Sequence, residues 1–306
     1  MHSGRVDPAA GAAAPRVLVA GCGDVGLRVA RAERAAGAEV TVHTRSGERA
    51  GALGAEGFVA VCHDLDSERP FSLPPGTIDR LYYLVPPPSR GRRDPRIGRF
   101  LAGLQGGVRR FVLLSTTAVY GDCGGARVDE RRPPAPAADR GHRRLDAERR
   151  LADWAAAGGA ATVVLRVAGI YGPGRLPVAR LERREPVLRE DLSPWSNRIH
   201  VDDLVTALLA AGERAPAGAV YNVADDRPST MTDYFNRVAD ALGLPRPPQI
   251  GPGEAGRLSA GMRSYLAESR RIDNGALRRE LGVDLRYPDL ASGLAALATA
   301  SAEVPQ

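Results

Sequence analysis

The sequence predicts an α/β protein with a doubly wound, mainly parallel sheet, followed by a small and mostly helical C-terminal part. Two observations lead to this prediction. Between residues 16 and 165, short apolar runs alternate with helical stretches, as in repeated strand–helix–strand units. The first of these runs leads at once into a glycine-rich turn and a helical stretch. With 306 residues, 43% of them hydrophobic, the chain can bury one large core.

The strands are expected where the apolar runs lie. Continuous runs such as 16–20 and 111–114 are typical of parallel strands that are buried on both faces. The first helix should end before Gly37, and the three prolines at 86–88 must end the fourth strand. We therefore expect strands at 16–20, 39–43, 58–61, 80–85, 108–114 and 161–165, and helices at 24–36, 96–104 and 140–157.

Beyond residue 171 the pattern loosens. A strand at 219–223 is expected to return to the sheet, and Ser229 or Thr230 should cap a following helix. We expect helices at 202–212, 230–242, 274–281 and 289–299, with a Pro/Gly loop at 245–256. The chain is therefore expected to comprise a flexible tail (1–14), a sheet domain (15–172) and a smaller region (173–306).

Composition argues against several classes of protein. No apolar run approaches the roughly 20 residues of a membrane-spanning helix, and the first fifteen residues lack the apolar segment of a secretion signal. Cys22, Cys62 and Cys123 form no CxxC pair, and the five histidines are scattered. We therefore expect a cytoplasmic protein with no membrane contact, no disulfide framework and no metal site.

The charged residues favour a small anionic ligand over nucleic acid. The chain has no lysine, so all 42 basic residues are arginine, and the net charge is +6. Acidic residues are interleaved with the arginines, and few aromatics accompany the arginine clusters. A nucleic-acid surface would instead concentrate basic residues beside stacking aromatics, so no nucleic-acid partner is expected. The positive net charge still favours an anionic ligand.

The first strand leads into the sequence Gly21-Cys22-Gly23-Asp24-Val25-Gly26, which fits GxGxxG. A strand before this pattern and a helix after it are the context that gives the pattern meaning. Gly21 permits the tight turn, Gly23 lets a pyrophosphate approach the backbone, and Gly26 lets the helix pack close to the strand. The free N–H groups of the helix N-terminus, including those of Asp24 and Val25, then face the phosphates. The sequence therefore predicts a Rossmann-type sheet that binds a dinucleotide within residues 15–172.

The end of the second strand favours NADP over NAD. An NAD site usually has an acidic residue here for the ribose 2′-hydroxyl, whereas this chain has Thr44, Arg45 and Ser46, which could hold a 2′-phosphate. NAD stays open as the alternative, because Arg45 could also be a solvated surface residue. Asp64, beside Leu65 after the third strand, could accept a hydrogen bond from the adenine amino group or simply form a turn.

Four ordered segments resemble the extended short-chain dehydrogenases/reductases, the NAD-dependent epimerase/dehydratase group. They are Leu114–Gly121, Leu165–Gly174, Asn197–Leu204 and Tyr221–Ala224, and the resemblance spans residues 16–294. The glycine spacing, the block 120–125 and the block 143–148 are similar to the family's atypical, YeeZ-like members. The resemblance implies a small-molecule substrate bound by residues 173–306, and a homodimer.

The resemblance also implies a catalytic Tyr-x-x-x-Lys pair on the helix after the fifth strand, which this chain lacks. The tyrosine position falls at Arg140 and the lysine position at Arg144. Arg144 could still hydrogen-bond the nicotinamide ribose, but a guanidinium cannot exchange a proton near neutral pH. Thr116 matches the family's catalytic hydroxyl, and the neighbouring Ser115 is a further candidate cofactor contact. Pro86 opens a rigid loop where the ribose and nicotinamide would lie.

Other residues are weaker candidates. Tyr82, Tyr83, Tyr171 or His200 could replace the missing proton donor, although packing or structural hydrogen bonds are the better explanation for each of them. Arg198 and His200 are candidate substrate contacts, because arginine binds carboxylates and phosphates in a bidentate manner. Arg166 is a further anion-binding candidate. For each of these arginines, an ordinary salt bridge is the alternative.

Three functions compete at this point. The first is an NADP(H)-dependent oxidoreductase, epimerase or dehydratase with a non-standard acid. The second is an NADP(H)-binding redox sensor or regulatory protein without turnover, which the missing Tyr and Lys favour. The third is a structural relative that has lost the cofactor, which the glycine turn and Arg45 argue against. No GxSxG sequence supports a serine hydrolase.

Overall fold

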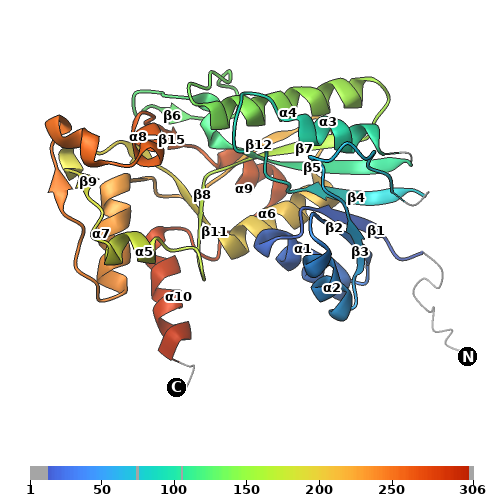
Figure 1. The fold of residues 1–306 in the computed structure, drawn as a ribbon, viewed down its shortest axis with the longest axis horizontal. Coiled ribbons are helices and arrows are strands. Elements are labelled where there is room, and N and C mark those ends of the chain that lie inside the picture. The colour runs from blue at the N-terminus through green and yellow to red at the C-terminus, as the bar shows by residue number, and fades with distance from the viewer. Residues whose placement is uncertain (1–12, 74–75, 105, 303–306) are drawn as a thin grey trace, which may run out of the picture.

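A computed structural model describes residues 13–73, 76–104 and 106–302 (Figure 1). Most of the predicted tail, residues 1–12, lies outside the described residues. The central sheet has seven parallel strands in the order β12-β7-β5-β4-β1-β2-β3. These strands are β1 (Arg16–Ala20), β2 (Glu39–Thr44), β3 (Val59–Cys62), β4 (Ile78–Tyr83), β5 (Val108–Thr116), β7 (Ala161–Val167) and β12 (Val220–Val223).

The two faces of the sheet are covered by different helices. Successive residues of β1 point to opposite faces: Val17 and Val19 join one core cluster, and Leu18 and Ala20 join another. In Figure 1, α3 and α4 lie above the sheet, and α1, α2, α6 and α9 lie below it. Their bounds are α1 Asp24–Ala35, α2 Gly47–Ala55, α3 Pro95–Ala102, α4 Asp139–Ala156, α6 Val201–Arg214 and α9 Gly275–Leu281. Coverage on both faces explains why the strands read as unbroken apolar runs.

The predicted Rossmann-type class is confirmed by this doubly wound arrangement. The chain leaves β1 towards β2 on one side and later returns to β4 on the other. A crevice forms at such a point, outside the carboxyl ends of the strands, and is where ligands bind in open α/β sheets. The fold therefore places the glycine turn after β1 beside the end of β4.

The C-terminal part has its own core and lies to the left of the sheet in Figure 1. Its apolar side chains include Tyr171, Leu181, Phe235 and Leu294. The helices of this part are α5 Val178–Glu182, α7 Met231–Ala241, α8 Ala260–Leu266 and α10 Leu290–Ala302. Short strand pairs link it together: β8 (Gly169–Tyr171) with β11 (Arg198–His200), β9 (Val187–Leu188) with β14 (Gln249–Ile250), β10 (Trp195–Ser196) with β13 (Ser229–Thr230), and β6 (Arg127–Val128) with β15 (Arg271–Ile272).

Several local expectations need correction. Helices α2, α5 and α8 were not predicted, and β14 and a 3-10 turn lie where a plain loop at 245–256 was expected. Four glycines between residues 47 and 57 conceal α2, which Ser46 caps by accepting a hydrogen bond from the Arg49 N–H. Two-residue strands carry no readable periodicity, so a single sequence does not reveal them. None of the helices in the described residues is both long and apolar enough to cross a membrane.

Candidate functional site

The turn after β1 can accept only glycine at two of its positions. Gly21 has φ +87°, and a Cβ there would lie 2.7 Å from the Val85 nitrogen at the end of β4. At Gly26 a Cβ would lie 2.6 Å from the Gly21 carbonyl oxygen. A Cβ at Gly23 would meet nothing within 4 Å, which leaves room for a ligand against that backbone. Because Gly23 provides no side-chain cap, the N–H groups of the first turn of α1 remain available to phosphate.

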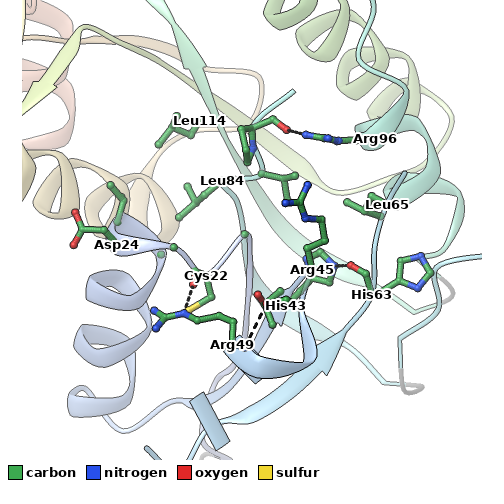
Figure 2. A pocket seen from close by; sticks show the side chains of 18 of the residues that line it. Cys22, Asp24, His43, Arg45, Arg49, His63, Leu65, Leu84, Arg96 and Leu114 are labelled. Carbon is green, nitrogen blue, oxygen red and sulfur yellow. Dashed lines mark hydrogen bonds between the residues drawn. The ribbon is translucent and has the colours of Figure 1, made fainter. Parts of the chain in front are cut away.

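A cavity of about 730 Å³ opens at this turn and runs along the carboxyl ends of β1, β2 and β4 (Figure 2). Eleven predicted cofactor residues line it: Gly21, Gly23, Asp24, Val25, Gly26, Thr44, Arg45, Ser46, Asp64, Leu65 and Pro86. Several other residues that line the cavity were not predicted, among them Cys22, His43, Arg49, Arg96 and Arg175. The glycine turn, the end of β2 and the loop after β4 therefore meet around one space of dinucleotide size.

Arginines gather at one end of this first cavity. Arg45 follows β2, and Arg49 lies one turn further on in α2, where its Nε donates to the Cys22 carbonyl at 3.4 Å. Figure 2 shows Arg45 and Arg96 on the side of the cavity away from Asp24. Within the described part of the chain, neither Arg45 nor Arg49 forms an ion pair, whereas Arg96 is paired with Asp66. The two unpaired guanidinium groups are thus available to an anion.

Two predicted cofactor residues, Ser115 and Arg144, do not line this first cavity. Ser115 donates its hydroxyl proton to Glu148, and Glu148 is also held by Arg166 at 2.8 Å in a buried ion pair. Arg144 is buried and donates to the Val85 carbonyl at 3.1 Å. Contact between these two residues and a cofactor stays a prediction. Arg166 was considered for anion binding, with an ordinary salt bridge as the alternative, and its pairing with Glu148 supports the salt bridge.

A second cavity of about 510 Å³ adjoins the first, and Ile170 and Arg175 line both. Thr116 and Arg198, predicted as catalytic and substrate-binding, line this second cavity, as does Arg140 at the expected tyrosine position. Thr116 Oγ1 also accepts a hydrogen bond of 3.3 Å from the Ala118 N–H. The cavity is walled by aromatic and methionine side chains of the C-terminal part: Trp195, Met231, Tyr234, Phe235, Met262 and Tyr265.

His200 does not line the second cavity. Its Nδ1 accepts a hydrogen bond from the Asp202 N–H at the start of α6. Its ring lies between Tyr171 and Tyr287, with centroid distances of 5.3 and 4.0 Å. Burial lowers the pKa of His200, so the neutral ring is favoured. These contacts give His200 a structural role, and its proposed contact with substrate stays a prediction.

Arg198 is a buried cation that lines the second cavity. Its guanidinium donates to the Asn197 carbonyl at 2.8 Å and lies 4.1 Å from the Tyr234 ring centroid. No carboxylate among the described residues forms an ion pair with it. Burial lowers the pKa of Arg198, which reflects the cost of desolvating this charge. A desolvated guanidinium facing a cavity favours binding of an anion there.

Arg140, at the position expected for the catalytic tyrosine, is held by charged side chains of the C-terminal part. Glu268 Oε2 accepts from Arg140 at 2.8 Å and from Arg270 at 2.9 Å, and all three residues line the second cavity. Glu268 Oε1 and the Nε atoms of both arginines are buried and have no hydrogen-bond partner among the described residues. The three side chains thus give the second cavity a charged wall, although these three atoms are themselves shielded from it.

The tyrosines considered as replacement acids lie elsewhere. Tyr82 donates to Glu33 at 2.5 Å, and Tyr171 donates to the Asp289 carbonyl at 3.2 Å. Tyr83 is also fully buried, and burial raises the pKa of all three phenols. None of the three lines either cavity. Packing and structural hydrogen bonds therefore account for these tyrosines.

A doubly wound sheet with a glycine turn, a dinucleotide-sized cavity and an adjoining polar cavity defines a Rossmann-type nucleotide-binding protein. Comparison with protein families narrows this class, because residues 101–224 match the model of the NAD-dependent epimerase/dehydratase family. The chain belongs to that family, as the sequence motifs predicted. The matched segment contains β5, α4, β7 and β12, while the glycine turn lies before it.

Individual relatives agree with this assignment. The Escherichia coli protein YeeZ is 29% identical over 183 residues, which are 60% of this chain and 60% of YeeZ, so the aligned part spans less than two thirds of that relative. The structure of a functionally unknown conserved protein from Silicibacter pomeroyi is 33% identical, covers 95% of this chain and 100% of its own, and has a TM-score of 0.77. MoeE5 in complex with UDP-glucuronic acid and NAD is 25% identical, with 94% and 99% coverage and a TM-score of 0.71.

Proposed function

We propose that the protein binds NADP(H) in the first cavity and acts on a small anionic substrate in the second. The reaction would be that of an oxidoreductase, epimerase or dehydratase working without the usual Tyr-x-x-x-Lys pair. One observation carries this proposal: the two cavities adjoin, and Ile170 and Arg175 belong to the walls of both. A dinucleotide seated on the glycine turn and a substrate beside Thr116 would then share one continuous site.

The choice of NADP rests on the end of β2. Thr44, Arg45 and Ser46 line the first cavity, and Arg49 reaches it from α2. Neither guanidinium has an ion-pair partner among the described residues, and the end of β2 carries no acidic residue of the kind that binds a ribose 2′-hydroxyl in NAD sites. A 2′-phosphate would supply the missing anion. The solved relative MoeE5 contains NAD, which keeps NAD as the alternative cofactor.

The substrate class follows from the second cavity. Arg198 would pair with a carboxylate or phosphate, and the polar side chains of Arg140, Glu268 and Arg270, which line the cavity, would bind hydroxyl groups. UDP-glucuronic acid in MoeE5 is a compound that combines both features. Its uronic acid or phosphate portion is therefore a rational probe for this cavity.

A non-catalytic role is the second candidate, and a specific observation favours it. The tyrosines considered as acids lie outside both cavities, and the residue at the expected tyrosine position is Arg140, held by Glu268. Thr116 can hydrogen-bond a substrate oxygen, but an aliphatic hydroxyl is a poor proton donor at neutral pH. In this alternative the protein binds NADP(H) as a redox sensor or regulatory partner, in the cytoplasm.

Titration with both reduced cofactors, followed by a turnover assay, tests the proposal. We expect binding to the protein to enhance the nicotinamide fluorescence of both cofactors, and the NADPH titration to saturate at a lower concentration than the NADH titration. Loss of that fluorescence with keto sugar acids, or a gain of it when NADP+ is supplied with hydroxy sugar acids, would support the enzyme if Thr116→Ala abolishes the change. Tight NADPH binding without turnover of any carbonyl or hydroxy compound would support the sensor. Failure of both dinucleotides to bind at millimolar concentration would refute either function.

A further inference from the structure

The phosphate-binding turn carries an acidic side chain at a position where charge matters. Asp24 is the first residue of α1 and lines the first cavity. The positive end of the helix dipole stabilises its carboxylate, and the same dipole would stabilise a pyrophosphate. Asp24 and a bound pyrophosphate are therefore two anions that would compete for one positive region.

Two arginines hold Asp24, and they come from different parts of the molecule. Arg28, one turn along α1, donates through Nε to Oδ1 at 3.1 Å and also pairs with Asp202 at 2.9 Å. Arg175 donates through Nε to Oδ2 at 2.8 Å. Arg175 lies in the segment between β8 and α5, on the substrate side of the site. Of these two arginines, only Arg175 lines the cavities, and it lines both.

The Asp24–Arg175 pair is a contact that a ligand can replace. The side chains of both residues remain partly exposed, and ion pairs of this kind are weak because water competes for each partner. Desolvation alone would raise the pKa of Asp24, but hydrogen bonds from Arg175 and Arg28 lower it overall. Asp24 therefore stays ionised at neutral pH, and it keeps Arg28 as a partner if Arg175 leaves. A dinucleotide phosphate offers Arg175 a stronger, bidentate partner.

We propose that Arg175 is a cofactor-binding residue supplied from the substrate side, and that the pyrophosphate displaces Asp24 from its guanidinium. This inference rests on the proposed function, because it requires a dinucleotide on the glycine turn. In the free protein, the Asp24 carboxylate pairs with the Arg175 guanidinium. In the complex Arg175 pairs with the pyrophosphate, and Asp24 is left to Arg28. Cofactor binding thereby moves a residue of the second cavity's wall.

Titration of the full chain with NADPH, followed by nicotinamide fluorescence, tests the exchange. Arg175→Gln is expected to weaken binding about tenfold, the equivalent of one charge-assisted phosphate contact. Arg31→Gln is the matched control, since Arg31 also lies on α1 but is paired with Glu56 and lines neither cavity, and this change should weaken binding less than twofold. Asp24→Asn frees Arg175 and should tighten binding about threefold. In an Arg175→Gln background, the same Asp24→Asn change should gain less than half of that.

Five outcomes test the exchange. Arg175→Lys should recover part of the lost affinity, which a purely structural role of Arg175 would not explain. Equal losses for Arg175→Gln and Arg31→Gln would overturn the inference. An Asp24→Asn gain of the same size in both backgrounds would overturn it too. If the unmodified protein binds no dinucleotide, the proposed function itself fails, whereas unchanged affinity in Arg175→Gln refutes this inference alone.

Discussion

The two cavities of this protein are built in different ways. The first is built mainly from local segments, each of which follows a strand of one parallel sheet: the glycine turn, the ends of β2 and β3 and the loop after β4. The second is assembled from residues as distant in the chain as Thr116, Arg198 and Arg270. The first depends on backbone shape and free N–H groups, while the second depends on buried charged side chains. Substitutions should therefore affect the first through geometry and the second through charge balance.

The largest effect is expected from Gly21→Ala. A Cβ would lie 2.7 Å from the Val85 nitrogen, and φ +87° is strained for alanine. We expect a loss of several kcal/mol in the free energy of unfolding and at least a hundredfold weaker NADPH binding. Thermal unfolding and fluorescence titration would measure the two effects.

Gly23→Ala is the control for that substitution, because its Cβ would meet nothing within 4 Å. It should leave the melting temperature of the free protein nearly unchanged while weakening the approach of a pyrophosphate. Equal destabilisation by the two alanines would contradict the geometric account of the first cavity.

This contrast also explains which features the sequence revealed. The fold class and eleven lining residues of the first cavity could be predicted, because GxGxxG and the strand ends are local patterns. Arg49 was missed because glycines conceal α2. Glu268 and Arg270 were missed because only the folded chain brings them to Arg140. Sequence patterns report contacts within one turn or one strand, whereas a cluster spread over 130 residues leaves no periodic signal.

The charge balance of the second cavity is tested by Arg198→Met. Methionine keeps much of the packing against Tyr234 and removes a buried charge without a counter-ion, so we expect a melting temperature about 2–4 °C higher. Binding of glucuronate or inorganic phosphate, measured by calorimetry, should weaken about thirtyfold. Arg180→Met is the matched control, since Arg180 lines the same cavity but is paired with Glu185 at 2.7 Å. A lower melting temperature for Arg198→Met would contradict the absence of a counter-ion.

Asp225 gives a second test of the charge balance around Arg198, through the pH dependence of the free energy of unfolding. Its backbone N–H donates to the Arg198 carbonyl at 2.7 Å, and burial raises its pKa to about 8. Below that pKa the carboxyl is protonated in the folded protein and does not neutralise Arg198. Because the unfolded carboxyl loses its proton near pH 4, this group destabilises the fold increasingly as pH rises from about 4 to 8.

Asp225→Asn removes this dependence. Relative to the unmodified protein, the variant should gain about 3–4 kcal/mol more at pH 8 than at pH 5. Urea unfolding at the two pH values would measure the difference. A gain that is the same at both pH values would mean that Asp225 is ionised throughout, and Arg198 would then have a counter-charge nearby.

The smallest effect concerns cofactor choice in the first cavity. Arg45→Ala removes one guanidinium without an ion pair in the described residues, and Arg49→Ala removes the other. Each should weaken NADPH binding about tenfold and leave NADH binding within about twofold, since only NADPH has a 2′-phosphate for these side chains. Arg31→Ala is the control: Arg31 lies on α1, is paired with Glu56 at 2.6 Å and lies outside both cavities. An equal loss of NADH and NADPH affinity in Arg45→Ala would mean that Arg45 contacts a part common to both cofactors. The proposed preference for NADP would then lose its support, and any choice between the two cofactors would depend on a group other than Arg45.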